Sequence, residues 1–163
     1  MKVSNIHRRI IAQPKARVEE LFRTLSSKED MMLATDKWSP MLLDNGLNVG
    51  SRGGHGPIRY TVRDYNRDNY IQFQFTKPKG FNGFHQFEIS EIDANSTALK
   101  HSIDMTTVGL ATLKWVLAIR WLHDAYIEDA FDKVENHFIA DKKSSKWTIW
   151  VKFLRRILKP KRK

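Results

Sequence analysis

The segment YIQFQFTK, residues 70–77, shows most clearly the alternation of apolar and polar residues that indicates the fold. Its large apolar side chains, Ile71, Phe73 and Phe75, alternate with the polar Gln72 and Gln74. Successive side chains of a strand point to opposite faces of a sheet, so this pattern predicts a strand with one buried and one solvated face. A sheet that is apolar on one side only is typical of antiparallel strands.

Three further segments alternate in the same way: IRYTVRDY (58–65), HQFEISEI (85–92) and ALKHSIDMT (98–106). Short turn-forming connections separate them, which predicts an antiparallel meander. Apolar spacing also predicts a strand near residues 3–12, a helix after Pro14 and a long helix over about residues 110–140. This order indicates an α+β domain, in which a curved antiparallel sheet wraps around the long C-terminal helix.

The long helix carries polar residues within its apolar stripe. In RWLHDAYIEDAFD, residues 120–132, Arg120 lies at the centre of the arc that the apolar side chains form, with His123 and Asp124 close to it. A buried charge without a partner is costly. These residues therefore predict either a paired network that orients the helix or polar contacts to a bound molecule.

Two stretches of the sequence resemble a known family. GGHGPIRYTV (53–62) and RWLHDAYIEDAFD, with IIAQP before the first helix and WSPM in the following loop, resemble the SRPBCC family. This START and Bet v 1-like superfamily includes polyketide cyclases and lipid-transfer proteins. The resemblance covers about residues 3–140 and implies a helix-grip fold with an internal apolar cavity between sheet and helix. It implies binding of lipids, sterols, polyketides or other hydrophobic molecules, and it carries over no catalytic residue.

The expected cavity is lined by inward strand positions and by the stripe of the long helix. Together they form a mostly apolar pocket with a few polar groups, which is the usual composition of a ligand site. The predicted ligand-binding residues are Tyr60, Phe73, Phe75, His85, Phe87, Ile89, Leu99, His101, Ile103, Met105, Arg120, His123, Asp124 and Ile127.

The sequence favours a binding protein over an enzyme, and we assign no catalytic residue. The alternative is a polyketide cyclase- or dehydratase-like enzyme, in which His85, His101 or His123 would perform acid–base chemistry on a bound carbonyl compound.

We predict no metal and no cofactor. His123, Asp124, Glu128 and Asp132 share one helix but lack the His-x-x-x-His or Glu-x-x-His spacing of helical metal sites. We expect Glu128, Asp129 and Asp132 to form a solvated acidic face.

The net charge of +10 belongs to the C-terminal end of the chain. Ten of the 28 Lys and Arg residues lie within residues 142–163, where there is no Asp or Glu, so the other 18 balance the 18 acidic residues. A neutral body argues against a nucleic-acid partner. We therefore divide the chain into a helix-grip ligand-binding domain, residues 1–141, and a basic amphipathic C-terminal helix or tail, residues 142–163.

The tail sequence KWTIWVKFLRRILK, residues 146–159, places large apolar residues on one helical face and cations on the other. This pattern predicts a helix that lies on an anionic membrane surface. The predicted membrane-binding residues are Trp147, Trp150, Lys152, Leu154, Arg155, Arg156 and Lys159. Two alternatives stay open: the tail packs on its own domain, or it docks a partner protein as part of a regulatory interaction module.

The predicted partners are thus a hydrophobic small molecule or lipid and an anionic membrane surface. The sequence shows neither a signal peptide nor an apolar run long enough to span a bilayer, and it contains no cysteine. We expect a cytoplasmic protein that is peripheral at the inner face of the membrane.

Overall fold

The computed structural model describes residues 1–158. One helix follows the first strand, the other six strands come next, and the remaining helices follow the last strand. The strands are β1 (Lys2–Ile11), β2 (Leu42–Leu43), β3 (Arg52–His55), β4 (Ile58–Asn66), β5 (Tyr70–Lys77), β6 (Phe81–Asp93) and β7 (Ser96–Thr107). The helices are α1 (Lys15–Phe22), α2 (Leu110–Lys114), the π-helical η1 (Trp115–Ile119), α3 (Arg120–Phe138) and α4 (Ile149–Leu158).

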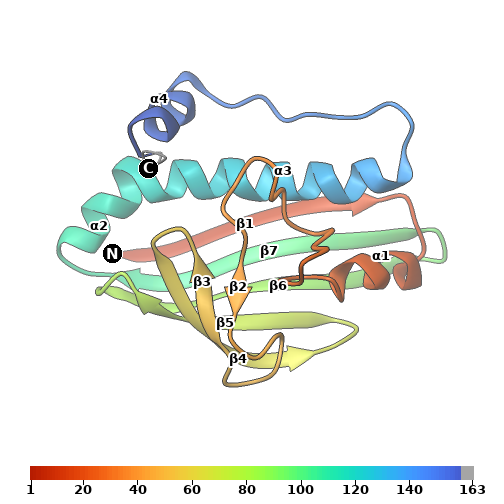
Figure 1. Cartoon of the computed structure of the whole chain (residues 1–163), viewed down its shortest axis with the longest axis horizontal. Helices are drawn as coiled ribbons and strands as arrows, with labels where there is room; N and C mark the ends of the chain where they lie inside the picture. The colour runs from red at the N-terminus through yellow and green to blue at the C-terminus, as the bar shows by residue number, and fades with distance from the viewer. Residues whose placement is uncertain (159–163) are drawn as a thin grey trace.

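Within residues 1–158, the seven strands form one antiparallel sheet in the order β1-β7-β6-β5-β4-β3-β2. Strands β3 to β7 follow one another in space as they do in the chain, which confirms the predicted meander. The exception is β1, which pairs with β7, so the first and last strands lie side by side (Figure 1).

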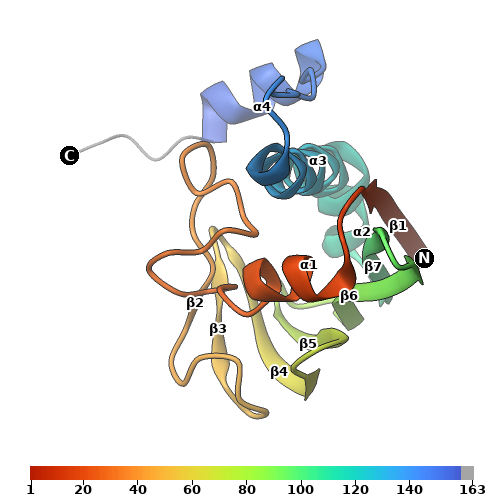
Figure 2. The same cartoon turned by 90° about the vertical axis from the view of Figure 1, so that its right-hand side faces the viewer.

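Figure 2 looks along α3 and shows the sheet curving below it, with α4 on the side of α3 that faces away from the sheet. The expected α+β helix-grip architecture is therefore confirmed. The long helix runs from Leu110 to Phe138, and its second turn, η1, is wound as a π-helix.

The inner face of the sheet follows the alternation that the sequence predicts. Ile71, Phe73 and Phe75 of β5 are buried, whereas Gln72 and Gln74 point to the other face and are half-buried. The inner face packs against the stripe of α3 and against α1, whose Val18, Leu21 and Phe22 are buried.

Candidate functional site

The contact between β1 and α3 consists of polar side chains. Asn5, His7 and Arg9 lie on the inward row of β1, between the buried Val3 and Ile11. Their partners are acidic residues along one face of α3, namely Asp124, Glu128, Asp132 and Glu135.

Arg9 and His7 each bind more than one carboxylate. Arg9 donates from Nη1 to Asp132 Oδ1 (3.1 Å) and Glu135 Oε2 (2.7 Å), and from Nη2 to Glu128 Oε2 (2.9 Å). His7 contacts Glu128 Oε1 through Nδ1 (2.7 Å) and Asp124 Oδ1 through Nε2 (3.1 Å). These residues form a charge-paired interface across the edge of the sheet.

The paired charges shift the pKa values of this interface. Burial lowers the pKa of His7, but its hydrogen bonds to Asp124 and Glu128 outweigh burial and raise the pKa to about 9. Burial raises the pKa of Asp124, but contacts with His123, His7 and Asn5 bring it well below its ordinary value. His7 is therefore a cation at neutral pH and Asp124 an anion.

The prediction that Glu128, Asp129 and Asp132 form a solvated acidic face is wrong for two of these three residues. Asp129 and Asp132 are buried, and only Glu128 keeps a moderately exposed side chain. The reason is that β1 and the C-terminal segment cover this side of α3 and supply cationic and N–H donors.

Two buried imidazoles lie deeper, under the middle of the sheet. His85 on β6 and His101 on β7 are both almost fully buried, and Nδ1 of His85 shares a 3.2 Å hydrogen bond with Nε2 of His101. His85 also stacks on Phe73 and Phe75, with ring centroids 4.8 and 5.0 Å apart.

Further polar rings extend this pair in both directions. Tyr60 lies edge-on to His85 at 4.8 Å, and its hydroxyl shares a 3.1 Å hydrogen bond with Nδ1 of His55. On the other side, the ring of His101 lies 4.9 Å from that of His123 on α3. A series of polar aromatic rings thus crosses the interior from β3 to α3.

These interior imidazoles are neutral at pH 7. Desolvation is the main cause that lowers the pKa of His85 and His101 well below the ordinary value, and Coulomb repulsion from neighbouring imidazoles is the second cause. Desolvation also lowers the pKa of His123, and it lowers that of His55 to about 4.

Several polar atoms in this interior have no hydrogen-bond partner within residues 1–158. They are His85 Nε2, His101 Nδ1, both ring nitrogens of His123 and the hydroxyl of Tyr126. A buried polar atom without a partner costs roughly 1–3 kcal/mol, so such atoms are normally satisfied by water or by a ligand. The arrangement can therefore donate to and accept from a polar group of a small molecule.

The structure brings the predicted strand residues together on the inner face. All ten are buried there: Tyr60, Phe73, Phe75, His85, Phe87, Ile89, Leu99, His101, Ile103 and Met105. On α3, Ile127 is buried, His123 lies against His101, and Asp124 turns toward β1. Whether these residues line a ligand cavity stays a prediction.

The prediction for Arg120 is wrong. Its side chain is 54% exposed and lies over the ring of Trp121, 3.8 Å from Asp124. Arg120 keeps the helical phase of Ile127, because α3 is α-helical from Arg120 onward, but it is the first residue of α3 and its side chain lies at the exposed surface beside Asp124. Val116, which the arc also included, lies in the π-helical η1 and is exposed too.

Residues of β1 and β3 that sequence reasoning missed complete the site. Asn5, His7 and Arg9 bind α3, and His55 stacks on Tyr126 with centroids 4.8 Å apart. The only available signal was that these polar residues alternate with apolar ones.

Asp129 fixes the C-terminal segment to the domain. This buried carboxylate accepts hydrogen bonds from Lys37 Nζ (2.7 Å), Trp38 Nε1 (2.8 Å) and Trp147 Nε1 (2.8 Å). The guanidinium of Arg155 lies over the rings of Trp38 and Trp147, 4.0 and 4.1 Å from their centroids. One face of α4 is thereby held against α3 and the Trp38 loop.

This docking corrects part of the predicted membrane contact. Trp147, Leu154 and Arg155 face the domain because Asp129, Trp38 and the neighbouring core bind them. The opposite face of α4 is exposed and includes Ile149, Trp150, Lys152, Phe153, Arg156, Ile157 and Leu158. Lys159 lies outside the described residues, and no helix within them is long and apolar enough to cross a membrane.

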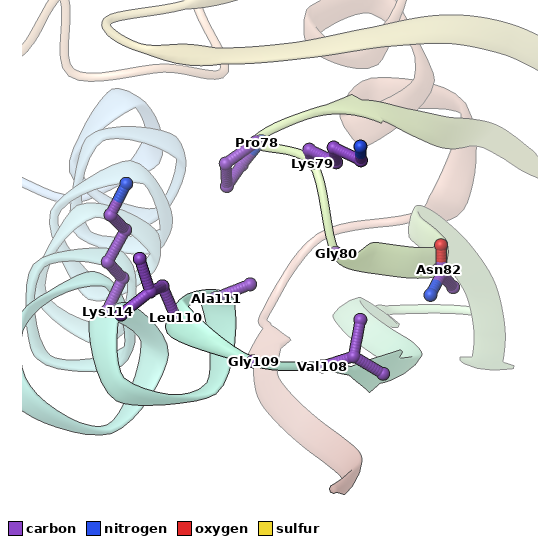
Figure 3. A pocket seen from close by; sticks show the side chains of 9 residues that line it. All are labelled: Pro78, Lys79, Gly80, Asn82, Val108, Gly109, Leu110, Ala111 and Lys114. Atoms are coloured by element: carbon purple, nitrogen blue, oxygen red, sulfur yellow. The ribbon is translucent and has the colours of Figure 1, made fainter.

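Two hollows open at the surface, away from the interior imidazoles. The larger, of about 610 Å³, lies between the β5–β6 turn and the start of α2 (Figure 3). Its lining includes Lys79, Val108, Leu110 and Lys114, and so combines apolar side chains with two cations. The smaller, of about 280 Å³, adjoins Asp129.

Comparison with known proteins supports the fold class. No family model matches the sequence, and no curated protein is similar to it. Among solved structures, the chain resembles norcoclaurine synthase from Thalictrum flavum in complex with dopamine and hydroxybenzaldehyde, at 12% identity and a TM-score of 0.61, over 86% of this chain and 91% of that one.

Two other structures share the fold. CalU16 from Micromonospora echinospora gives a TM-score of 0.58 at 15% identity, over 96% of this chain and 84% of that one. A protein from Nitrosospira multiformis gives 0.64 at 14% identity, over 85% and 98%. These likenesses show the helix-grip fold, a curved antiparallel sheet around a long C-terminal helix.

Proposed function

We propose that this protein binds a hydrophobic small molecule or lipid while docked on an anionic membrane through α4. The observation that carries this proposal is the free face of α4. Ile149 is 87% exposed, and Phe153, Ile157 and Leu158 are each about half exposed. Large apolar side chains at this exposure usually mark a contact surface.

The exposed apolar face of α4 continues onto the long helix. Nε1 of Trp150 donates to the backbone oxygen of Leu117 (2.9 Å), which joins α4 to η1. Leu117 is itself exposed, and so are Leu113 and Leu110, one and two turns earlier. We call these residues, with the exposed apolar residues of α4, the apolar surface.

Cations accompany the apolar surface. Lys114, Lys152 and Arg156 are exposed on α2 and α4, and α2, η1 and α4 contain no Asp or Glu. Arg120, the first residue of α3, is exposed directly after η1. Each cation near an anionic bilayer is worth roughly 1 kcal/mol, and buried apolar area adds to this. Apolar and cationic residues together favour an anionic membrane over an uncharged partner, and anionic lipids are abundant on the cytoplasmic leaflet.

Vesicle binding tests the membrane contact. Full-length protein should float with phosphatidylglycerol vesicles and much less with phosphatidylcholine vesicles. The double substitution Ile149→Ser and Phe153→Ser should weaken partitioning at least tenfold, because each lost side chain removes about 1.5–3 kcal/mol of apolar burial.

The matched control is Ile6→Ser with Ile10→Ser, on the outer face of β1. These residues are also exposed, and their strand lies on the other side of α3 from α4 (Figure 1). The control should bind anionic vesicles like the natural protein. Equal losses in both double variants, or no binding by the natural protein, would exclude the membrane contact; capture of a protein partner alone would favour the interaction module.

The small-molecule part of the proposal is supported by the fold class and by the interior imidazoles. The hydroxybenzaldehyde complex of the structural neighbour suggests a hydrophobic guest with a polar group, for which His85 and His101 offer neutral ring nitrogens. Native mass spectrometry of protein purified from its own host should show a retained molecule. A mass equal to the bare chain in every preparation would contradict this expectation.

A carrier and an enzyme differ in their need for these rings. A carrier should retain its molecule when His85 is replaced by Gln, whereas a cyclase-like enzyme would need an imidazole that exchanges protons.

A further inference from the structure

Three potential metal ligands meet where β1 contacts α3. His7, His123 and Asp124 each offer one ligand atom, and these atoms all lie within 4.8 Å of one another. The first comes from β1 and the other two from α3. Spacing along one helix could not predict this group, because His7 lies more than 100 residues before the other two ligands in the sequence.

The separations fit a small tetrahedral ion. Nε2 of His7 lies 3.1 Å from Oδ1 of Asp124, and Nδ1 of His123 lies 3.5 Å from the same oxygen. Metal bonds of 2.0–2.1 Å in a tetrahedron put neighbouring ligand atoms about 3.3 Å apart. The two distances to Asp124 bracket this value, and the ligand atoms of the two imidazoles lie within 4.8 Å of each other.

His123 gives an independent indication of a missing contact. Both of its ring nitrogens are buried, and neither has a hydrogen-bond partner in the described part of the chain. Its side chain is only 13% exposed, so bulk water has limited access to it. A metal ion beside Asp124 would satisfy Nδ1.

The surrounding residues are those that orient metal ligands. Glu128 accepts from Nδ1 of His7 (2.7 Å), which directs Nε2 of the same ring toward Asp124. In the metal-free protein Nε2 carries a proton and donates it to Asp124, so a bound ion takes the place of that proton and releases it to solvent. Asn5 donates from Nδ2 to Asp124 Oδ1 (2.9 Å). Carboxylate–histidine contacts of this kind fix the ring orientation at metal sites.

We propose that His7, His123 and Asp124 form a binding site for a divalent transition-metal ion, with Zn²⁺ as the best fit. Two imidazoles and one carboxylate suit Zn²⁺ better than Mg²⁺ or Ca²⁺, which prefer oxygen ligands. Three protein ligands leave a fourth position for water or for an oxygen of a bound molecule. This site goes beyond the proposed function and does not depend on membrane contact.

Calorimetric titration of the full chain, first dialysed against a chelator, tests the site with Zn²⁺ as the probe. One ion should bind per chain. His123→Asn and Asp124→Asn should each weaken binding at least tenfold, and Glu128→Gln, which changes only the orienting group, by about tenfold. Co²⁺ bound at the same place should give the intense visible absorption of tetrahedral coordination.

The matched control is His137→Asn, an exposed imidazole near the end of the same helix. It should bind Zn²⁺ like the natural protein. Circular dichroism identifies any variant that fails to fold, and Asp124→Asn, which keeps the side-chain shape, provides a second test if His123→Asn unfolds. Binding that survives in folded His123→Asn and Asp124→Asn, an equal loss in His137→Asn, or no saturable binding by the natural protein would overturn the proposal.

Discussion

His7 and His101 face each other across the β1–β7 ladder, yet the structure gives them opposite charge states. His7 binds two carboxylates, and its pKa rises to about 9. His101, one strand further in, has only another neutral imidazole as a hydrogen-bond partner among residues 1–158, and its pKa falls. Both side chains are largely buried, so the identity of the contacting group, more than depth, decides the charge of an imidazole here.

The same contrast separates the two regions in energetic terms. The charge-paired interface compensates the burial of its ions with close contacts from both sides. The interior imidazoles avoid charge altogether, and several of their ring nitrogens have no hydrogen-bond partner among residues 1–158. Four measurements test whether charge pairing stabilises the first region and desolvation keeps the second region neutral.

Removing Arg9 should have the largest effect. Arg9→Ala leaves Asp132 buried without its guanidinium and removes a contact from Glu128 and Glu135, so we expect a loss of about 3 kcal/mol in the free energy of unfolding. Denaturant unfolding measures it. The neighbouring Arg8 is exposed on the other face of β1, and Arg8→Ala should cost less than about 0.5 kcal/mol. Equal losses would mean that the interface is not charge-paired in solution.

Acid should destabilise the interior. The interior imidazoles have lowered pKa values when folded, so the unfolded chain binds more protons below pH 6.5. Stability should fall from pH 6.5 toward about 4, by up to roughly 1.4 kcal/mol per pH unit for each imidazole. His85→Phe, stacked on Phe73 and Phe75, should show a shallower fall, worth about 2 kcal/mol at pH 5. An unchanged slope would show that His85 does not remain neutral in the fold.

Alkali should act on His7 in the opposite sense. Its raised folded pKa contributes stability that is complete below pH 6.5 and is lost as the pH rises through about 9. His7→Gln should therefore be less stable than the natural protein at pH 6.5, by about 1.5 kcal/mol, and equally stable above pH 9.5. Denaturation curves at both pH values test this; a constant difference would contradict the raised pKa.

An ion pair on the outer face of the sheet should matter least. Lys100 Nζ lies 3.2 Å from Glu88 Oε2, and both side chains are about a third exposed. Lys100→Ala should cost no more than about 0.5 kcal/mol in thermal or denaturant unfolding. A larger cost would remove the distinction between exposed and buried pairs.

The inner face of the sheet could be predicted because it depends on local alternation. Phe73 and Phe75 of β5 are buried where a two-residue period places them, and the buried His85 and His101 follow the same rule. The long helix could be predicted equally well, because its apolar positions recur with the helical period.

The β1–α3 contact could not be predicted in this way. On β1 the apolar Ile6 and Ile10 are exposed, and the polar His7 and Arg9 point inward, which is the reverse of the usual pattern. Their inward position makes sense only beside the carboxylates of α3, and no local pattern reports a partner so far along the chain. Arg120 was misplaced for a different reason: it shares the helical phase of the buried Ile127, but it is the first residue of α3 and is exposed, and a periodic pattern does not report how far the covered face extends along a helix.

The docking of α4 shows a similar limit. An amphipathic pattern indicates which residues share a face, but it does not say which face is covered. Trp147 and Arg155 turned inward because Asp129 and Trp38 bind them, and the more exposed Ile149 and Phe153 point outward.

The position of β1 beside β7 has a consequence for how the chain is made. The first strand leaves the ribosome early, yet the strand that it joins ends at Thr107 and the helix that it binds ends at Phe138. During synthesis β1 is made before β7 and α3, so for that time it is an unpaired strand that could pair with other chains. Lys2, Arg8 and Arg9 give this unpaired strand a positive charge, which discourages such pairing until the carboxylates of α3 neutralise part of it.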